Sequence, residues 1–185
     1  MKLLRFILII SISLTLPIKA DLNKKLMSQL EDGGKLIFIR HAYAPGSGDP
    51  NNFNLNDCST QRNLNKDGRK QAQHIGEFFI NNKIKIDKIL SSEWCRCMET
   101  ANLAFNEFIK KDFLNSFYSS KFEKNKNNQM KNLKEYVKNW ENENNLVLIT
   151  HYVVISEALN YTPSSGEIII SDRNFNLIGT YKTEF

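Results

Sequence analysis

Short apolar runs of strand length recur along the chain, and this recurrence most limits the folds open to it. The clearest run, residues 145–150, has the sequence Asn-Leu-Val-Leu-Ile-Thr, a continuous apolar core typical of a buried strand. Residues 35–39 form a second run and residues 88–91 a third. Strands that alternate with helices build layered folds in which helices cover the sheet. The pattern therefore predicts an α/β fold, a three-layer α/β/α sandwich with a mostly parallel central sheet.

Segments of helical periodicity separate these runs. In sheets of this kind ligands bind beyond the carboxyl ends of the strands. Residues that directly follow the runs are therefore the first candidates for a functional site.

The segment 121–129, rich in Lys and Asn, is predicted to be a solvated loop or the start of a helix. Helices are predicted over residues 65–80, around 98–105 and 133–140, and over 153–159, with a terminal pair of strands over 167–170 and 177–181.

The first twenty residues differ from the rest of the chain. Two basic residues precede an apolar run over residues 6–16, and a Pro-Ile-Lys-Ala segment follows it and ends at Ala20. This order is typical of a signal peptide, and the run is shorter than the roughly 20 apolar residues that span a bilayer. We therefore predict a signal peptide over residues 1–20 and one mature domain over residues 21–185, secreted or periplasmic and without stable membrane insertion. An uncleaved amphipathic anchor is the alternative.

Charge and composition exclude two classes of protein. The 185 residues carry a formal charge of +5, and loss of Lys2, Arg5 and Lys19 with the signal peptide would lower it to +2. The other lysines are spread among Asn and Glu instead of clustering with aromatic residues, so nucleic-acid binding is not predicted. With 41% hydrophobic and 24% charged residues, the chain is also unlike a disordered tail or linker. No pattern indicates an oligomeric state.

Two of the three histidines follow predicted strands. Arg40 and His41 directly follow the run at 35–39, and His151 directly follows the run at 145–150. Arg96 lies shortly after the third run, at the start of a predicted helix. Guanidinium groups match phosphate oxygens, and a neutral imidazole can attack phosphorus to form a phosphohistidine. This sheet edge is therefore predicted to be a phosphate pocket that needs neither a metal ion nor another cofactor.

Four sequence blocks resemble the histidine phosphatase superfamily, also called the phosphoglycerate mutase-like superfamily. The hallmark of that family is an Arg-His-Gly triplet at the end of the first strand. The blocks occur in family order and cover residues 35–159, which makes the set specific although a lone Arg-His pair would not be. They are Arg40-His41-Ala42, then Arg62-Asn-Leu64 with Gly68 and Gln71-Ala72, then Ser91-Ser-Glu-Trp-Cys-Arg96 with Thr100-Ala101, and Leu146 to His151.

The resemblance implies a role for each matching residue. His41 is the implied nucleophile, and Arg40 and Arg96 are the implied phosphate ligands. His151 is the second pocket histidine, which supports the transferred phosphoryl group, and Arg62 is placed at the rim. The third histidine, His74, lies inside the predicted helix 65–80 and is interpreted as structural or exposed.

The chain departs from the family pattern at the positions that concern the proton donor. Tyr152 follows His151 where acid-phosphatase relatives have Asp, so that type of donor is absent. Mutase-like members use a Glu after the third block, where this chain has Leu114-Asn115 and only later Glu123. Asp57, in the loop after His41, is the first choice for the donor. Its alternative role is a turn or cap, because Asx side chains in such loops bond the local backbone.

The expected activity is hydrolysis of a small phosphomonoester through a phosphohistidine at His41. Hydrolysis is favoured over mutase activity because an exported mutase lacks an obvious supply of bisphosphate primer. One alternative is a phosphohistidine or pyrophosphate-bond hydrolase that acts on an envelope component. The other is a non-catalytic phosphate-binding module.

The three cysteines gain a structural role if the protein is exported, because disulfides persist in oxidising compartments. Cys58 lies in the loop after His41, and Cys95 and Cys97 flank Arg96. If both segments frame one pocket, Cys58 pairs with Cys95 or Cys97 and one thiol stays free. A bridge between Cys95 and Cys97 would strain the start of a helix. Cys-x-Cys without a second pair or a nearby His is poor zinc spacing, so no metal site is predicted.

Overall fold

The computed structural model of the protein describes residues 16–183. Helix α1 (Leu16–Asp32) begins inside the predicted signal peptide, whose other residues, 1–15, lie outside the described residues. Cleavage after Ala20 and the division into residues 1–20 and 21–185 therefore stay predictions. No helix within residues 16–183 is both long enough and apolar enough to cross a membrane.

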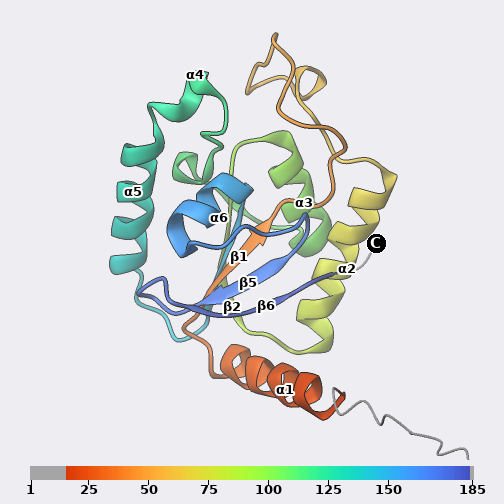
Figure 1. The fold of residues 1–185 in the computed structure, drawn as a ribbon, viewed down its shortest axis with the longest axis vertical. Coiled ribbons are helices and arrows are strands. Elements are labelled where there is room, and N and C mark those ends of the chain that lie inside the picture. The colour runs from red at the N-terminus through yellow and green to blue at the C-terminus, as the bar shows by residue number, and fades with distance from the viewer. Residues whose placement is uncertain (1–15, 184–185) are drawn as a thin grey trace, which may run out of the picture.

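One mixed sheet forms the centre of the molecule (Figure 1). Its strand order within residues 16–183 is β3-β2-β4-β1-β5-β6. Strands β3, β2, β4 and β1 run parallel, and β5 and β6 add antiparallel strands at one side. The predicted α/β fold with a mostly parallel sheet is confirmed. The strands are β1 (Leu36–Arg40), β2 (Ile86–Ser91), β3 (Ile109–Lys110), β4 (Asn145–Thr150), β5 (Ile168–Ser171) and β6 (Leu177–Tyr181).

Helices cover both faces of this sheet, and Figure 1 shows α5 and α2 on opposite sides of it. Side chains of a strand alternate between faces, so Phe38 packs in the core beneath α5 and α6 while Ile37 and Ile39 pack in the core with α2 and α3. The two apolar layers explain why the central strands are continuously hydrophobic. The helices after α1 are α2 (Lys66–Asn81), α3 (Cys95–Phe105), α4 (Ser120–Glu123), α5 (Lys126–Lys138) and α6 (Tyr152–Leu159).

Helix α2 illustrates how local chemistry sets these elements. Asn65 caps it, because its side-chain oxygen accepts a hydrogen bond from the amide of Gly68 at 2.8 Å. Its buried face carries the expected periodic residues, including Ile75 and Phe79. Gly76 lies against α3, where a Cβ would approach the carbonyl oxygen of Ala104 to 2.4 Å. Glycine therefore permits the close packing of α2 on α3.

Three elements differ from the sequence predictions. Helix α1 is not predicted from the sequence, although Leu26 and Leu30 bury their side chains in the core layer that also holds α2. Figure 1 shows α1 at the end of the sheet opposite the loop that follows β1. Helix α5 ends at Lys138, so Trp140 lies beyond the helix, and strand β3 is a two-residue edge strand. The segment 121–129 contains most of α4 and the start of α5.

Candidate functional site

The parallel strands bring the candidate residues to one edge of the sheet. Arg40, the last residue of β1, is paired in register with Thr150, the last residue of β4. The amide of His41 donates to the Thr150 carbonyl at 2.9 Å, which continues this pairing one residue past the strand. The imidazole centroids of His41 and His151 are 5.5 Å apart. Two positions 110 residues apart in sequence thus become neighbours through main-chain hydrogen bonds.

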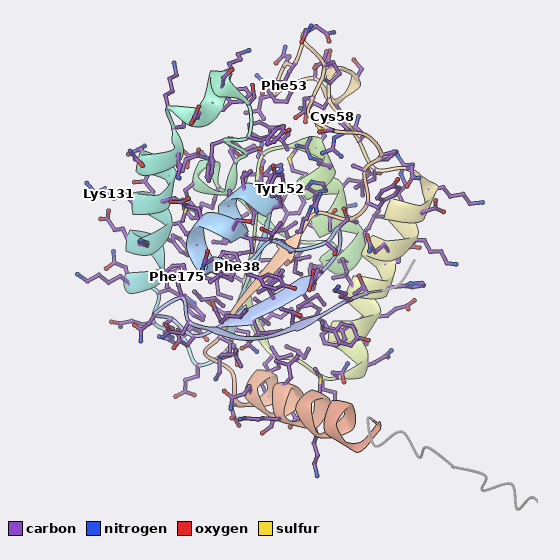
Figure 2. The ribbon with its side chains drawn as sticks, in the orientation of Figure 1. Phe38, Phe53, Cys58, Lys131, Tyr152 and Phe175 are labelled. Atoms are coloured by element: carbon purple, nitrogen blue, oxygen red, sulfur yellow. A yellow bond between two sulfur atoms is a disulfide. The ribbon has the colours of Figure 1, made fainter. Side chains whose placement is uncertain are left out.

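These side chains line a cavity of about 410 Å³ beyond the strand ends. We call Arg40, His41, Arg96 and His151 the cavity floor: Arg40, His41 and His151 lie at or next to the ends of β1 and β4, and Arg96 lies in the first turn of α3. The roof loop, residues 46–62, and the segment 116–122 supply most of the walls. Figure 2 shows Tyr152 at the start of α6 and, above it, the loop that carries Phe53 and Cys58.

His41 is held as a neutral base. Its Nδ1 lies 2.8 Å from the carbonyl oxygen of Ala42, so Nδ1 carries the hydrogen and Nε2 keeps its lone pair. Burial, and then the nearby charges of Arg96, Arg40 and Arg62, hold the pKa of His41 well below its ordinary value. The ring is therefore unprotonated at neutral pH and presents one basic nitrogen.

His151 is oriented by a chain of polar contacts. Arg96 donates from Nη2 to Nδ1 of His151 at 3.4 Å, and Nε2 of the ring donates to Ser92 Oγ at 2.9 Å. Ser92 in turn donates to Asn115 Oδ1 at 3.0 Å. Burial and the same arginine charge lower the pKa of His151 well below its ordinary value. Both floor imidazoles are therefore neutral.

The two floor arginines each keep a buried nitrogen without a hydrogen-bond partner among the described residues, namely Nε of Arg40 and Nε of Arg96. Arg40 donates from Nη1 to the carbonyl of Pro163 at 2.9 Å, and its guanidinium lies 5.4 Å from the ring centroid of Tyr152. Buried donors in proteins are nearly always paired. Unpaired guanidinium nitrogens beside two neutral imidazoles are suited to receive the oxygens of an anion such as phosphate.

Asp49 is a site residue that the sequence analysis missed. Its carboxylate pairs with Arg96 through two contacts, Oδ1 to Nη1 at 2.8 Å and Oδ2 to Nη2 at 3.3 Å. The indole nitrogen of Trp94 donates to Oδ2 at 3.1 Å, and the amide of Arg62 donates to Oδ1 at 3.0 Å. Burial raises the pKa of Asp49, but the donors from Arg96, Arg62 and Trp94 outweigh it, so the pKa lies below its ordinary value. Nothing in the Gly-Asp-Pro context of Asp49 indicates this pairing across 47 positions.

Aromatic rings form part of the walls. Phe53 of the roof loop stacks on Trp94 with centroids 5.1 Å apart, and Phe122 meets Trp94 edge to face at 5.5 Å. The ring centroids of Tyr118 and Tyr152 are 5.9 Å apart. The cavity therefore offers apolar surface above a cationic floor.

The roof loop is tied down by a disulfide and by Arg62. Cys58 is bonded to Cys95 at the start of α3, which confirms the predicted link between the loop and this helix. Cys97 is the free cysteine, buried, and burial raises the pKa of its thiol to about 12. Arg62 lines the cavity, but its Nε donates to Gly48 at 2.8 Å and its Nη1 donates to Ala44. Its guanidinium thus braces the loop from within.

Asp57 and His74 lie away from the cavity lining. Asp57 is exposed and caps the 3₁₀ helix η1 (Cys58–Thr60), accepting hydrogen bonds from the Ser59 amide at 3.0 Å and hydroxyl at 2.7 Å. The Ser59 contacts lower the pKa of the Asp57 carboxyl. The structure thus gives Asp57 the cap geometry of its alternative role and does not bring it to the floor. His74 is half-buried within α2.

The remaining motif residues hold the turn after His41. Thr100 accepts a hydrogen bond from the Ala42 amide at 3.0 Å, and Gln71 accepts one from the Tyr43 amide at 2.9 Å. At Gly68 a Cβ would lie 1.9 Å from the Tyr43 carbonyl oxygen, so only glycine permits this approach. Ala42, which replaces the family's glycine, is fully buried, and its φ is not in the left-handed region. Alanine is therefore tolerated there.

Metal-ligating side chains do not gather at this site. Across the part of the chain that the structure describes, no three His, Cys, Asp or Glu residues come together in a group that could hold a metal ion. The positive charge of the cavity comes from Arg40, Arg62, Arg96 and Lys121.

Comparisons with known proteins agree with this architecture. A protein histidine phosphatase SixA, solved with tungstate, has TM-score 0.53 and 14% identity, covering 77% of this chain and 92% of that chain. A variant phosphoserine phosphatase from Entamoeba histolytica, solved with phosphoserine, has TM-score 0.55 and 17% identity, covering 74% and 89%. Phosphoglycerate mutase from Thermus thermophilus has TM-score 0.54 and 13% identity, covering 81% and 99%.

Sequence comparison identifies the family. No curated protein sequence matches the chain. The sequence model of the histidine phosphatase superfamily (branch 1) matches residues 36–158, a range that contains the motif residues of all four blocks, from Arg40 to His151. The resemblance inferred from those blocks is thereby confirmed, and the chain belongs to the histidine phosphatase superfamily.

Proposed function

We propose that the protein hydrolyses phosphomonoesters through a covalent phosphohistidine at His41, without a metal ion. The observation that carries this proposal is the state of His41. Its Nδ1–H is engaged by the Ala42 carbonyl, which leaves Nε2 as a nucleophile beside Arg40 and Arg96. The names of the structural neighbours, which include a protein histidine phosphatase and a phosphoserine phosphatase, support phosphatase chemistry in general.

The proposed reaction has two steps. Arg40 and Arg96 bind the phosphoryl oxygens, and Nε2 of His41 attacks phosphorus while the bond to the leaving alcohol breaks. A proton joins the leaving oxygen. Water then attacks the phosphohistidine, the P–N bond breaks, and phosphate departs. His151, neutral and held by Ser92, supports the phosphoryl group in both steps.

We further propose that the protein works outside the cytosol, as a secreted or periplasmic domain. The Cys58–Cys95 disulfide supports this location, because the cytosol keeps most thiols reduced. N-terminal sequencing of the protein purified from its own host tests the proposed cleavage after Ala20. An unprocessed N-terminus would favour the anchor instead.

Trapping of the intermediate tests the proposed mechanism. The full chain is mixed with ³²P-labelled phosphomonoesters, quenched in alkali and mapped by mass spectrometry. A label on His41 that is lost in acid is expected. His41→Ala should abolish the label, whereas His74→Ala, which removes the histidine of α2, should keep it.

The same experiment separates the alternatives. A label from phosphohistidine peptides or pyrophosphates but from no ester would replace the phosphomonoesterase with the alternative hydrolase. Phosphate binding by calorimetry with neither label nor turnover would identify a binding module. Turnover with a label on another residue would contradict the role of His41.

A further inference from the structure

The mechanism proposed above needs a proton for the leaving alcohol, and the cavity offers few donors. The ring N–H of His41 donates to the Ala42 carbonyl, and the ring N–H of His151 donates to Ser92, so neither is free for the leaving oxygen. Arginine does not release its protons. Burial raises the pKa of Tyr152, which makes it a weaker acid. Asp49 is the single carboxyl group that lines the cavity among residues 16–183.

We propose that Asp49 is the general acid of this site and that the substrate is therefore a phosphate ester of an unactivated alcohol. This inference rests on the proposed phosphomonoesterase function and names the class of its substrate. An alkoxide leaves poorly unless it is protonated as the P–O bond breaks, whereas imidazole in phosphohistidine has less need of a donor. A carboxyl group beside the phosphate ligand Arg96 thus separates the two hydrolase alternatives.

Asp49 lines the same cavity as His41 and is bonded to Arg96. Two of the four hydrogen bonds that its carboxylate accepts within residues 16–183 come from Nη1 and Nη2 of Arg96, the proposed phosphate ligand, so a bound phosphoryl group would share this guanidinium with Asp49. The side chains are largely buried, with 4% of Arg96 and 16% of Asp49 exposed. Trp94 and the Arg62 amide also donate to this carboxylate, one to each oxygen, so these two hydrogen bonds still hold it when Arg96 turns to phosphate. The donor is therefore fixed before substrate arrives.

Substrate binding supplies the reason for Asp49 to take up a proton. In the free protein the groups around it are cationic or neutral: Arg96 bonds to it, the charge of Arg62 acts on it, and Lys121 and the neutral imidazoles line the same cavity. A phosphate dianion competes with the carboxylate for Arg96 and brings negative charge against it. A negative charge close to a carboxylate favours the protonated carboxyl group. Asp49 then holds one proton taken from solvent.

The proton balance closes over one turnover. In the first step the O–H bond of Asp49 breaks and its proton joins the bridging oxygen, while His41 Nε2 bonds to phosphorus and the P–O bond breaks. In the second step water attacks phosphorus and gives a proton to the Asp49 carboxylate, while the P–N bond breaks. Phosphate leaves, and Asp49 returns its proton to solvent as it pairs again with Arg96.

A series of leaving groups tests this role. We would measure kcat/KM for 4-nitrophenyl, phenyl and ethyl phosphate with the wild type, Asp49→Asn and Asp57→Asn. General acid catalysis contributes about 10²–10⁴-fold, so Asp49→Asn should lose that much with ethyl phosphate. With 4-nitrophenyl phosphate, whose leaving group needs no proton, the same variant should stay within roughly tenfold of wild type. Asp57→Asn should leave the dependence on the leaving group unchanged.

A binding measurement provides a readout that does not depend on turnover. At alkaline pH, where inorganic phosphate is a dianion, calorimetry in two buffers of different ionisation enthalpy should detect uptake of a proton by the wild type. Asp49→Asn should bind phosphate at least as tightly, because its side chain competes less for Arg96, and should take up no proton. The same titration shows that the variant is folded.

Three results would overturn the inference. An equal loss for all three esters in Asp49→Asn would make Asp49 a positioning residue for Arg96. A leaving-group dependence that steepens in Asp57→Asn and not in Asp49→Asn would move the acid to Asp57. If the wild type hydrolysed none of the esters and formed no His41 adduct, the proposed function itself would fail and this inference with it.

Discussion

The cavity floor and the roof loop meet around one cavity but are built in different ways. The floor extends the main-chain ladder of β1 and β4, and its imidazoles are almost fully buried. The roof loop has little regular structure beyond η1 and depends on side-chain contacts, such as those of Arg62 and Asp49, and on one disulfide. Positions of floor atoms are therefore set by the sheet, whereas the loop is positioned by a few contacts that can be removed singly.

This difference supports the proposed assignment of the chemistry to the floor and suggests that the loop adjusts substrate range and stability. A nucleophile needs a fixed position relative to phosphorus, and strand ends supply one. A loop held by a few contacts can vary in shape without disturbing the sheet. Variants of the floor should therefore reduce the rate most, and variants of the loop should change stability or the range of substrates.

The largest effect is expected at the floor nucleophile. His41→Ala should reduce turnover by roughly 10⁴-fold or more, because no other group can replace a covalent nucleophile. Circular dichroism should show an intact fold, since the side chain lies beyond the strand. His74→Ala is the matched control. A His41→Ala protein within roughly tenfold of wild type would end the assignment of chemistry to this residue.

Arg96 belongs to the floor and pairs with Asp49 of the roof loop, so a variant at Arg96 should affect both regions. Arg96→Lys keeps the charge but loses the paired donors that serve Asp49 and the phosphoryl group, and kcat/KM should fall by about 10³-fold. Arg69→Lys, which alters an exposed ion pair with Glu99 at 2.6 Å, should have little effect. Steady-state kinetics on both variants decides this, and similar losses in the two would contradict a specific role for the guanidinium of Arg96.

Removal of the disulfide isolates the loop. Cys58→Ser opens a link across 37 positions and should lower the free energy of unfolding by roughly 3–4 kcal/mol in the chain-entropy model. Turnover should fall much less than in His41→Ala, because the floor keeps its strand contacts. Urea denaturation and kinetics measure both quantities. A rate loss as large as that of the nucleophile variant would show that the loop, too, is needed to hold the floor.

The titrating groups of the two regions should affect the free energy of unfolding in different pH ranges. The floor imidazoles have pKa values well below 6.5, so the folded protein keeps them neutral while the unfolded chain protonates. Stability is therefore full above about 6.5 and falls as pH drops below it, by up to about 1.4 kcal/mol per pH unit for each histidine. Asp49 of the roof loop, with its pKa below 3.8, loses its contribution only at more acid pH. Urea titrations of wild type and His41→Ala check this, and His41→Ala should have the shallower slope.

The smallest effect is expected from chelation. The arginines of the floor supply the positive charge that a metal ion supplies in other phosphatases, so turnover should be unchanged after dialysis against a chelator. Phosphate release before and after dialysis measures this. Activity that disappears and returns with one divalent cation would transfer the electrostatic role from the arginines to that ion.

The sequence predicted the floor well because its signals are local. The run at 145–150 coincides with β4, and the run at 35–39 differs from β1 by one residue at each end. Continuous apolar segments of this length have one stable environment, a strand covered on both faces. Once the strands are parallel, residues that follow them must share an edge, which is why His41 and His151 could be paired from sequence.

The roof loop could be predicted only in outline. The sequence predicted that Cys58 pairs with a cysteine next to Arg96, but it left Cys95 and Cys97 as alternatives. The choice depends on how α3 is oriented: Cys95 reaches the loop, whereas Cys97 is buried 3.5 Å from His151. Asp49 shows the same limit, because an Asp before a proline in a loop gives no sign of a partner in α3.

The sequence by itself thus determined most of the elements, the family and the residues that follow the strands, since apolar periodicity and short motifs act over a few positions. The tertiary structure alone decided that Asp49 pairs with Arg96, that Asp57 caps η1 away from the cavity, and that Arg62 braces the loop. It also revealed α1, which has weak local signals and is held by burial of Leu26 and Leu30. The physical reason is the range of the interactions: periodicity is local, whereas an ion pair or a disulfide depends on where the whole chain brings two side chains.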